Sequence, residues 1–120
     1  MITIRQETEG NTLVIEAAGK LTATDYEETF IPKLEALIKQ HEKIRVVFYL
    51  NDSFEGWDLN AMWDDAKFGL QHKNDFERIA LVGGPRWAVW LTRLSSHFMN
   101  SEIKIFDSAS LHAAVDWAKR

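Results

Sequence analysis

The 120-residue sequence contains no cysteine, which excludes disulfide bonds, thiolate metal sites and a cysteine nucleophile. It has no apolar run close to the ~20 residues that a membrane-spanning helix needs. Its first ten residues also lack the apolar stretch of a signal peptide. These absences, together with the length, lead us to expect a single cytoplasmic domain that is not integral to a membrane.

Positive charge is also scarce. The sequence has 14 Lys and Arg against 18 Asp and Glu, giving a formal net charge of −4, and it contains no basic run. A protein that follows a nucleic-acid backbone needs a concentrated basic surface. We therefore expect no nucleic-acid partner.

Signals for catalysis are missing as well. The sequence has no G-x-S-x-G motif, no phosphate-binding loop and no dinucleotide fingerprint. The adjacent Asp64 and Asp65 would point in different directions from a helix, which disfavours a general acid–base pair. The histidines lack the close spacing of a metal or proton-relay motif; they are His41, His72, His97 and His112. The sequence predicts a non-enzymatic protein with no cofactor and no metal.

What the sequence does contain is a regular alternation of strand and helix patterns. Strand patterns occupy residues 2–6, 12–18, 43–50, 78–84 and 103–106, and helical patterns occupy 24–41, 58–72, 85–100 and 109–119. A turn at Glu9-Gly10-Asn11 predicts an antiparallel hairpin of the first two strands. The order ββαβαβαβα predicts an α/β fold with a mixed, mostly parallel five-stranded sheet. Because the strands alternate in polarity, we expect helices mainly on one face of the sheet.

The helix ends also carry recognisable signals. Thr24 and Glu27 have the spacing of a capping box at the start of the first helix. Pro32 should kink this helix or divide it, because proline lacks a backbone N–H and its ring crowds the preceding turn. Asp107 or Ser108 is predicted to cap the last helix.

The resemblance to a known family rests on the opening hairpin and on four segments spread over the chain. These are FYLNDSFEGWD (48–58), DDAKF (64–68), FERIALVGGPRW (76–87) and IKIFDSASLHAAVDWAK (103–119). Together they resemble the SpoIIAA-like family, relatives of STAS domains with a (βα) superhelix that is shared with CRAL-TRIO lipid-binding domains. The resemblance implies either a binding domain for an apolar or lipid-like ligand, or a STAS-type regulatory protein-interaction module.

Anti-sigma-factor antagonists of this superfamily carry a phosphorylatable serine that opens the helix after the third strand. Here Ser53 follows Asp52 but lies about five residues before the predicted helix. Glu55 and Asp58 would repel a phosphate nearby. We therefore interpret Ser53 as a turn residue and expect no phosphoserine switch.

Aromatic and glycine residues follow two neighbouring strands, where ligands bind in open α/β sheets. Asp58 can cap the helix of residues 58–72, and we expect helix starts at both turns to offer free N–H groups. The predicted cleft has aromatic walls and one arginine, and takes a small apolar or amphipathic ligand. Its residues are Trp57, Asp58, Gly83, Gly84, Arg86 and Trp87.

Three further residues are predicted to contact a membrane or a partner. Trp90 lies near Arg93 on the helix of residues 85–100, a composition found at anionic lipid surfaces and equally at a helix edge covered by cation–π contacts. Phe68 falls on the polar side of its helix. We expect peripheral association with the inner membrane. Phe68 and the second sheet face also predict a homodimer, because a monomer would expose their apolar surface.

Overall fold

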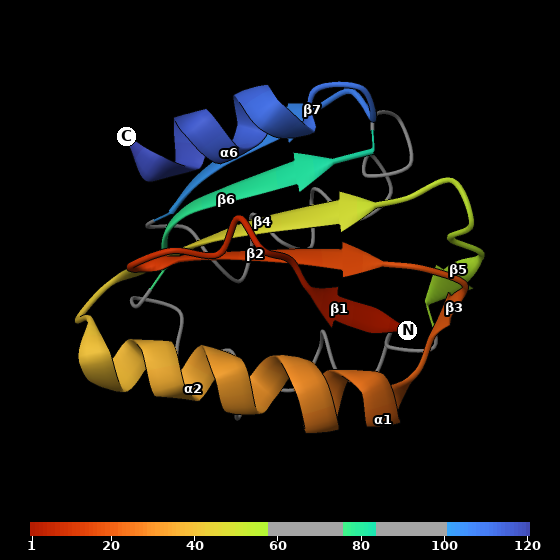
Figure 1. The fold of residues 1–120 in the computed structure, drawn as a ribbon, viewed down its shortest axis with the longest axis horizontal. Coiled ribbons are helices and arrows are strands. Elements are labelled where there is room, and N and C mark those ends of the chain that lie inside the picture. Colours follow the sequence, from red (N-terminus) through yellow and green to blue (C-terminus); the bar gives the residue numbers. More distant parts are fainter. Residues whose placement is uncertain (58–75, 84–100) are drawn as a thin grey trace.

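The computed structural model describes residues 1–57, 76–83 and 101–120 of the chain. Its five-stranded sheet has the order β1-β2-β4-β6-β7 (Figure 1). The strands are β1 (Ile2–Ile4), β2 (Thr12–Ala17), β4 (Ile44–Leu50), β6 (Phe76–Val82) and β7 (Glu102–Phe106). The described helical elements are α1 (Ala23–Asp25), the π-helix η1 (Tyr26–Phe30), α2 (Ile31–Gln40) and α6 (Leu111–Lys119).

The strand directions agree with the prediction. Strand β1 is antiparallel to β2, and the pairs β2–β4, β4–β6 and β6–β7 are parallel. The hairpin turns at Gly10 and Asn11, where Glu9 and Thr12 exchange backbone hydrogen bonds of 3.0 and 2.9 Å. Gly10 has φ +57°, a conformation that side chains disfavour, so glycine suits this turn. A second, two-stranded sheet was not predicted: β3 (Lys20–Leu21) pairs in parallel with β5 (Gly56–Trp57).

One face of the sheet packs against α2. Leu34 and Leu37 of α2, together with Phe30, enter an apolar cluster with the strands. The rings of Phe30 and Phe48 lie 5.3 Å apart between centroids, in a tilted arrangement. The strand residues of this cluster include Leu13, Ile15, Ala17, Val46, Leu50, Ile79 and Leu81.

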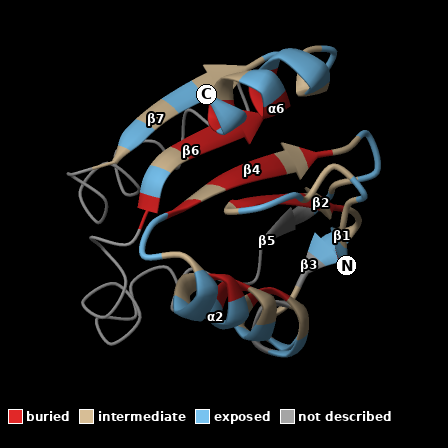
Figure 2. Cartoon of the chain, turned by 60° about the vertical axis from the view of Figure 1, so that its left-hand side comes forward, coloured by how far each residue is buried: buried red, intermediate tan, exposed pale blue. Residues whose placement is uncertain are grey.

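The opposite face packs against α6, so α2 and α6 lie on opposite sides of the sheet (Figure 2). Ala114 and Ala118 of α6 are small, which lets the helix approach Val47 and Ala80 of the sheet closely. The prediction of helices mainly on one face depends on residues 58–72 and 85–100. All of these lie outside the described residues, so it stays a prediction. No helix in the described ranges has the length and apolarity to cross a membrane.

The first helical segment begins two residues earlier than predicted. A capping box is present at Thr22 and Asp25, and Thr24, the predicted cap, lies inside α1. The Thr22 Oγ1 accepts from the Asp25 N–H at 3.3 Å, and the Asp25 carboxylate accepts from the Thr22 N–H at 3.2 Å. Pro32 lies in the first turn of α2, directly after η1, where its missing N–H costs little. Pro32 was predicted to kink or divide this helix. The helical run stays continuous, and its type changes from π to α at Ile31, directly before Pro32.

The last helix begins later than predicted and is held at its end. Ser110 is its N-cap residue and makes no side-chain capping bond, so the predicted caps at Asp107 or Ser108 were wrong. At the C-terminus, Arg45 Nη1 donates to the Ala118 carbonyl at 2.9 Å and Arg78 Nη1 donates to the Trp117 carbonyl at 2.6 Å. Two arginines of the sheet thus satisfy carbonyls that a helix end leaves open.

Candidate functional site

The carboxyl ends of β2 and β4 continue side by side beyond the main sheet. The Asn51 N–H donates to the Ala17 carbonyl at 3.2 Å, and the Gly19 N–H donates to the Ser53 carbonyl at 2.9 Å. The Glu55 N–H then donates to the Gly19 carbonyl at 2.8 Å, after which β3 and β5 pair. These backbone bonds fix the segment 51–55, which we call the β4 turn.

The side chain of Asn51 also holds the β4 turn in place. The Asn51 side-chain oxygen accepts from the Ser53 N–H at 2.9 Å and from the Ser53 hydroxyl at 2.8 Å. Phe54 packs against the apolar cluster on the α2 face. The side chains of Asp52, Ser53 and Glu55 are exposed. The interpretation of Ser53 as a turn residue is confirmed.

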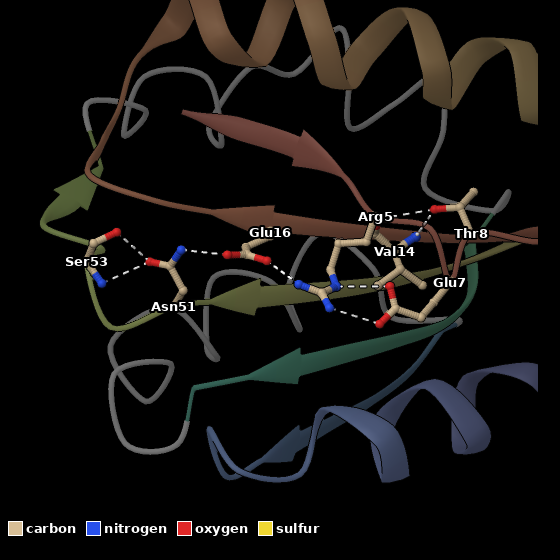
Figure 3. A network of polar contacts seen from close by, with 7 residues as sticks. All are labelled: Arg5, Glu7, Thr8, Val14, Glu16, Asn51 and Ser53. Carbon is tan, nitrogen blue, oxygen red and sulfur yellow. Dashed lines mark hydrogen bonds and ion pairs between the residues drawn. The ribbon is translucent and has the colours of Figure 1, made fainter.

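Asn51 also joins the turn to a chain of polar contacts that runs along β2 (Figure 3). Its side-chain amide donates to one oxygen of Glu16 at 2.6 Å, and Arg5 Nη1 donates to the other oxygen. Arg5 also binds Glu7 with two hydrogen bonds of 3.0 Å, in the two-point geometry that suits guanidinium and carboxylate. The guanidinium lies 5.7 Å from the ring centroid of Tyr49.

The charges in this network stabilise one another. The hydrogen bonds from Arg5 lower the pKa of Glu7. The same contact with Glu7, followed by that with Glu16, raises the pKa of Arg5 against the opposing effect of burial. Glu16 is half-buried between two donors, so removing either donor would leave a carboxylate with fewer partners. The network therefore holds the β4 turn to the β1–β2 hairpin.

This network was not predicted from the sequence. The one sequence signal for the network is Glu16, a charged residue in the otherwise apolar segment Leu13–Ala17. A carboxylate in that position requires donors nearby. Arg5 is a natural candidate, because the hairpin brings residues 2–4 alongside residues 15–17.

Two residues of the predicted cleft, Trp57 and Gly83, lie among the described residues. The backbone of Trp57 belongs to strand β5, directly before the predicted cap Asp58. Gly83 is buried with φ +144°, and its N–H donates to the Phe106 carbonyl at 3.0 Å, so it offers no free N–H group to a ligand. The roles of Trp57 and Gly83 as ligand-binding residues stay predictions. The other predicted site residues lie outside the described residues, and their roles also stay predictions. They are Asp58, Phe68, Gly84, Arg86, Trp87, Trp90 and Arg93.

Comparison with known proteins agrees with this architecture. The SpoIIAA-like family model matches residues 12–119. The chain belongs to the SpoIIAA-like family. A crystal structure of an uncharacterized Shewanella loihica protein with a SpoIIAA-like fold is 33% identical, with a TM-score of 0.70. The match covers 98% of this chain and 93% of that one. No curated protein matches the sequence.

The β4 turn of this SpoIIAA-like chain follows the third strand of the main sheet and contains Ser53. This is the region compared above with the serine of the anti-sigma-factor antagonists. No helix begins at Ser53 here; strand β5 follows instead. Within residues 1–57, 76–83 and 101–120, no group of His, Asp and Glu side chains could hold a metal ion.

Proposed function

We propose that this protein is a non-enzymatic, STAS-type regulatory module that binds a protein partner through the β4 turn. The observation that carries the proposal is the contrast between the fixed backbone of the turn and its exposed side chains. Backbone bonds from segment 17–19 and the side chain of Asn51 order the turn before any partner arrives. A preordered loop loses little conformational entropy on binding.

The charge of the turn indicates the chemistry of the partner. Asp52 and Glu55 are exposed acidic residues on either side of the hydroxyl of Ser53. A complementary partner surface is basic, since charge complementarity speeds encounter and disfavours wrong partners. The interaction does not require Ser53 to be phosphorylated, and its hydroxyl already donates to Asn51.

The test compares two charge changes at opposite ends of the sheet. Wild type, an Asp52→Lys/Glu55→Lys variant and a Glu42→Lys control are each used to capture proteins from the source cells. Glu42 is exposed in the connection before β4, at the opposite end of that strand from the turn. A partner of the turn is retained by wild type and the control and lost from the double variant. Titration of the purified partner should repeat that order of affinity.

The alternative, a small apolar or lipid-like ligand with peripheral membrane contact, makes a different prediction. Anionic phosphatidylglycerol vesicles would then shift the tryptophan emission of wild type to shorter wavelength, because rings would move from water into an apolar setting. An unchanged emission together with a turn-dependent protein partner supports the regulatory module. A blue shift with no such partner contradicts it.

A further inference from the structure

Strand β7 forms one edge of the main sheet (Figure 2). Phe106 lies opposite Val82 in the parallel register and accepts from the Gly83 N–H, so its backbone groups point toward β6. Backbone direction alternates along a strand, and Ile103 and Ile105 therefore direct their N–H and C=O groups outward. Within the described part of the chain, these outward groups have no hydrogen-bond partner.

The side chains of β7 are also less covered than those of its neighbour. Ile103 and Ile105 pack against the α2-face cluster but remain half-buried. Their register partners in β6, Ile79 and Leu81, are 4% and 0% exposed. A further strand beside β7 would cover the two isoleucines and satisfy their backbone groups.

The charges on β7 select which strand fits there. Glu102 and Lys104 are exposed and lie on the α6 face, opposite Arg78 and Ala80. Charged residues usually protect an edge strand from pairing. Here the two residues have opposite signs and flank Ile103, so an antiparallel copy centred on Ile103 brings each Glu102 against Lys104 of the other copy.

Other registers fit less well. Centring the pair on Lys104 sets two lysines opposite each other at the closer type of antiparallel pair, about 4.5 Å between Cα atoms. Centring it on Ile105 sets Lys104 against Phe106 and Ile103 against the exposed Asp107. Only the register centred on Ile103 pairs opposite charges twice.

From this self-complementarity we infer that two copies of the chain associate through antiparallel β7 strands, joining their sheets across a two-fold axis at Ile103. The homodimer predicted from the sequence rested instead on Phe68, which lies outside the described residues, and on the second sheet face. The ladder is short, and a small interface forms a weak dimer with a dissociation constant roughly in the micromolar range or above.

Sedimentation equilibrium up to about 0.5 mM spans that range. Wild type should approach twice the chain mass. Glu102→Lys and Lys104→Glu each create two like-charge pairs and should raise the dissociation constant about tenfold or more. Mixing the two variants restores opposite charges at both pairs and should restore dimerisation.

The mixture controls for side effects. Glu102→Lys also removes the 3.7 Å contact of Glu102 with Arg78, but rescue by the second variant cannot come from that loss. Glu35→Lys, an exposed charge change on α2, should leave the dimer intact. An intermolecular nuclear Overhauser contact between the Hα atoms of Glu102 and Lys104 would identify the register. A monomeric wild type, a dimer insensitive to Glu102→Lys, or a mixture without rescue would each overturn the inference.

Discussion

The two faces of the five-stranded sheet are built from different side chains. The α2 face is apolar throughout its core and contains large residues such as Leu34 and Phe48. The α6 face has an apolar centre of valines and alanines, surrounded by charged residues at both strand ends. Arg45 and Arg78 lie toward one end, and Glu16 lies toward the other.

The difference separates two tasks of the fold. Large apolar residues on the α2 face remove the most surface from water and so supply most of the stability. Charged residues on the α6 face form directed contacts: the arginines hold the end of α6, and Glu16 holds the β4 turn through Asn51. These charged residues at the strand ends of the α6 face position α6 and the β4 turn more than they stabilise the fold.

The largest effect should come from the α2 face. Leu34 is completely buried, so Leu34→Ala should lower the free energy of unfolding by about 2–5 kcal/mol. Val115→Ala on the α6 face removes fewer methyl groups and should cost about 2 kcal/mol. Urea denaturation measures both. Equal costs would contradict the division of tasks between the faces.

A smaller effect is expected where the sheet holds α6. Arg78→Met keeps most of the side-chain stem but removes the donor to the Trp117 carbonyl, which should cost about 1.5–3 kcal/mol. Hydrogen exchange should increase in the last turn of α6. Lys119→Met is the control, because its partner Glu9 has a 79% exposed side chain and such surface pairs contribute at most about 1 kcal/mol. If Lys119→Met lowered stability as much as Arg78→Met, the role of Arg78 in anchoring α6 would be refuted.

The strand pattern was sufficient to predict the main sheet, because period-two alternation and turn residues act locally. Residues 43–50 illustrate this, since the observed strand Ile44–Leu50 differs by one residue. The small sheet of β3 and β5 could not be predicted from two-residue segments. It forms because β2 and β4 already run parallel at that edge. The N-cap of the first helix was predicted two residues too late, because more than one residue near its start, such as Thr22 and Thr24, can act as a cap.

The site was harder to predict than the fold. Local sequence identified residues 51–58 as functionally interesting and Ser53 as a turn residue. It did not reveal the link from Asn51 to Arg5, which are 46 positions apart in the chain and meet only through Glu16. Gly83 was predicted to line a ligand site, and register with β7 directs its N–H to Phe106.

The capping box offers a matched pair of substitutions on the α2 side of the molecule. Thr22→Ala removes the acceptor for the Asp25 N–H and should lower stability by about 1 kcal/mol. Thr24→Ala, the cap expected from sequence, should change it by less than about 0.5 kcal/mol because Thr24 is exposed inside the helix. Thermal or urea unfolding distinguishes the two. A larger loss for Thr24→Ala would restore the original assignment.

The smallest effect should lie in the polar network and should depend on pH. Because the pKa of Glu7 is lowered in the folded protein, its ion pair contributes stability above the pKa of the unfolded chain. That contribution disappears as pH falls through the lower, folded-state pKa. Glu7→Gln should therefore reduce stability by up to about 1 kcal/mol at pH 7, and the difference from wild type should shrink below the ordinary glutamate range.

A double-mutant cycle with Arg5→Met assigns this pH dependence to the pair. With the guanidinium removed, Glu7→Gln should no longer produce a difference that varies with pH, since the hydrogen bonds from Arg5 are the main cause of the lowered pKa. Arg5→Met alone should also accelerate amide exchange at Ser53, because Glu16 loses one of the two donors that orient it toward Asn51. Unchanged exchange at Ser53 would mean that backbone bonds alone hold the β4 turn. The charged residues of the α6 face would then not control the position of the turn.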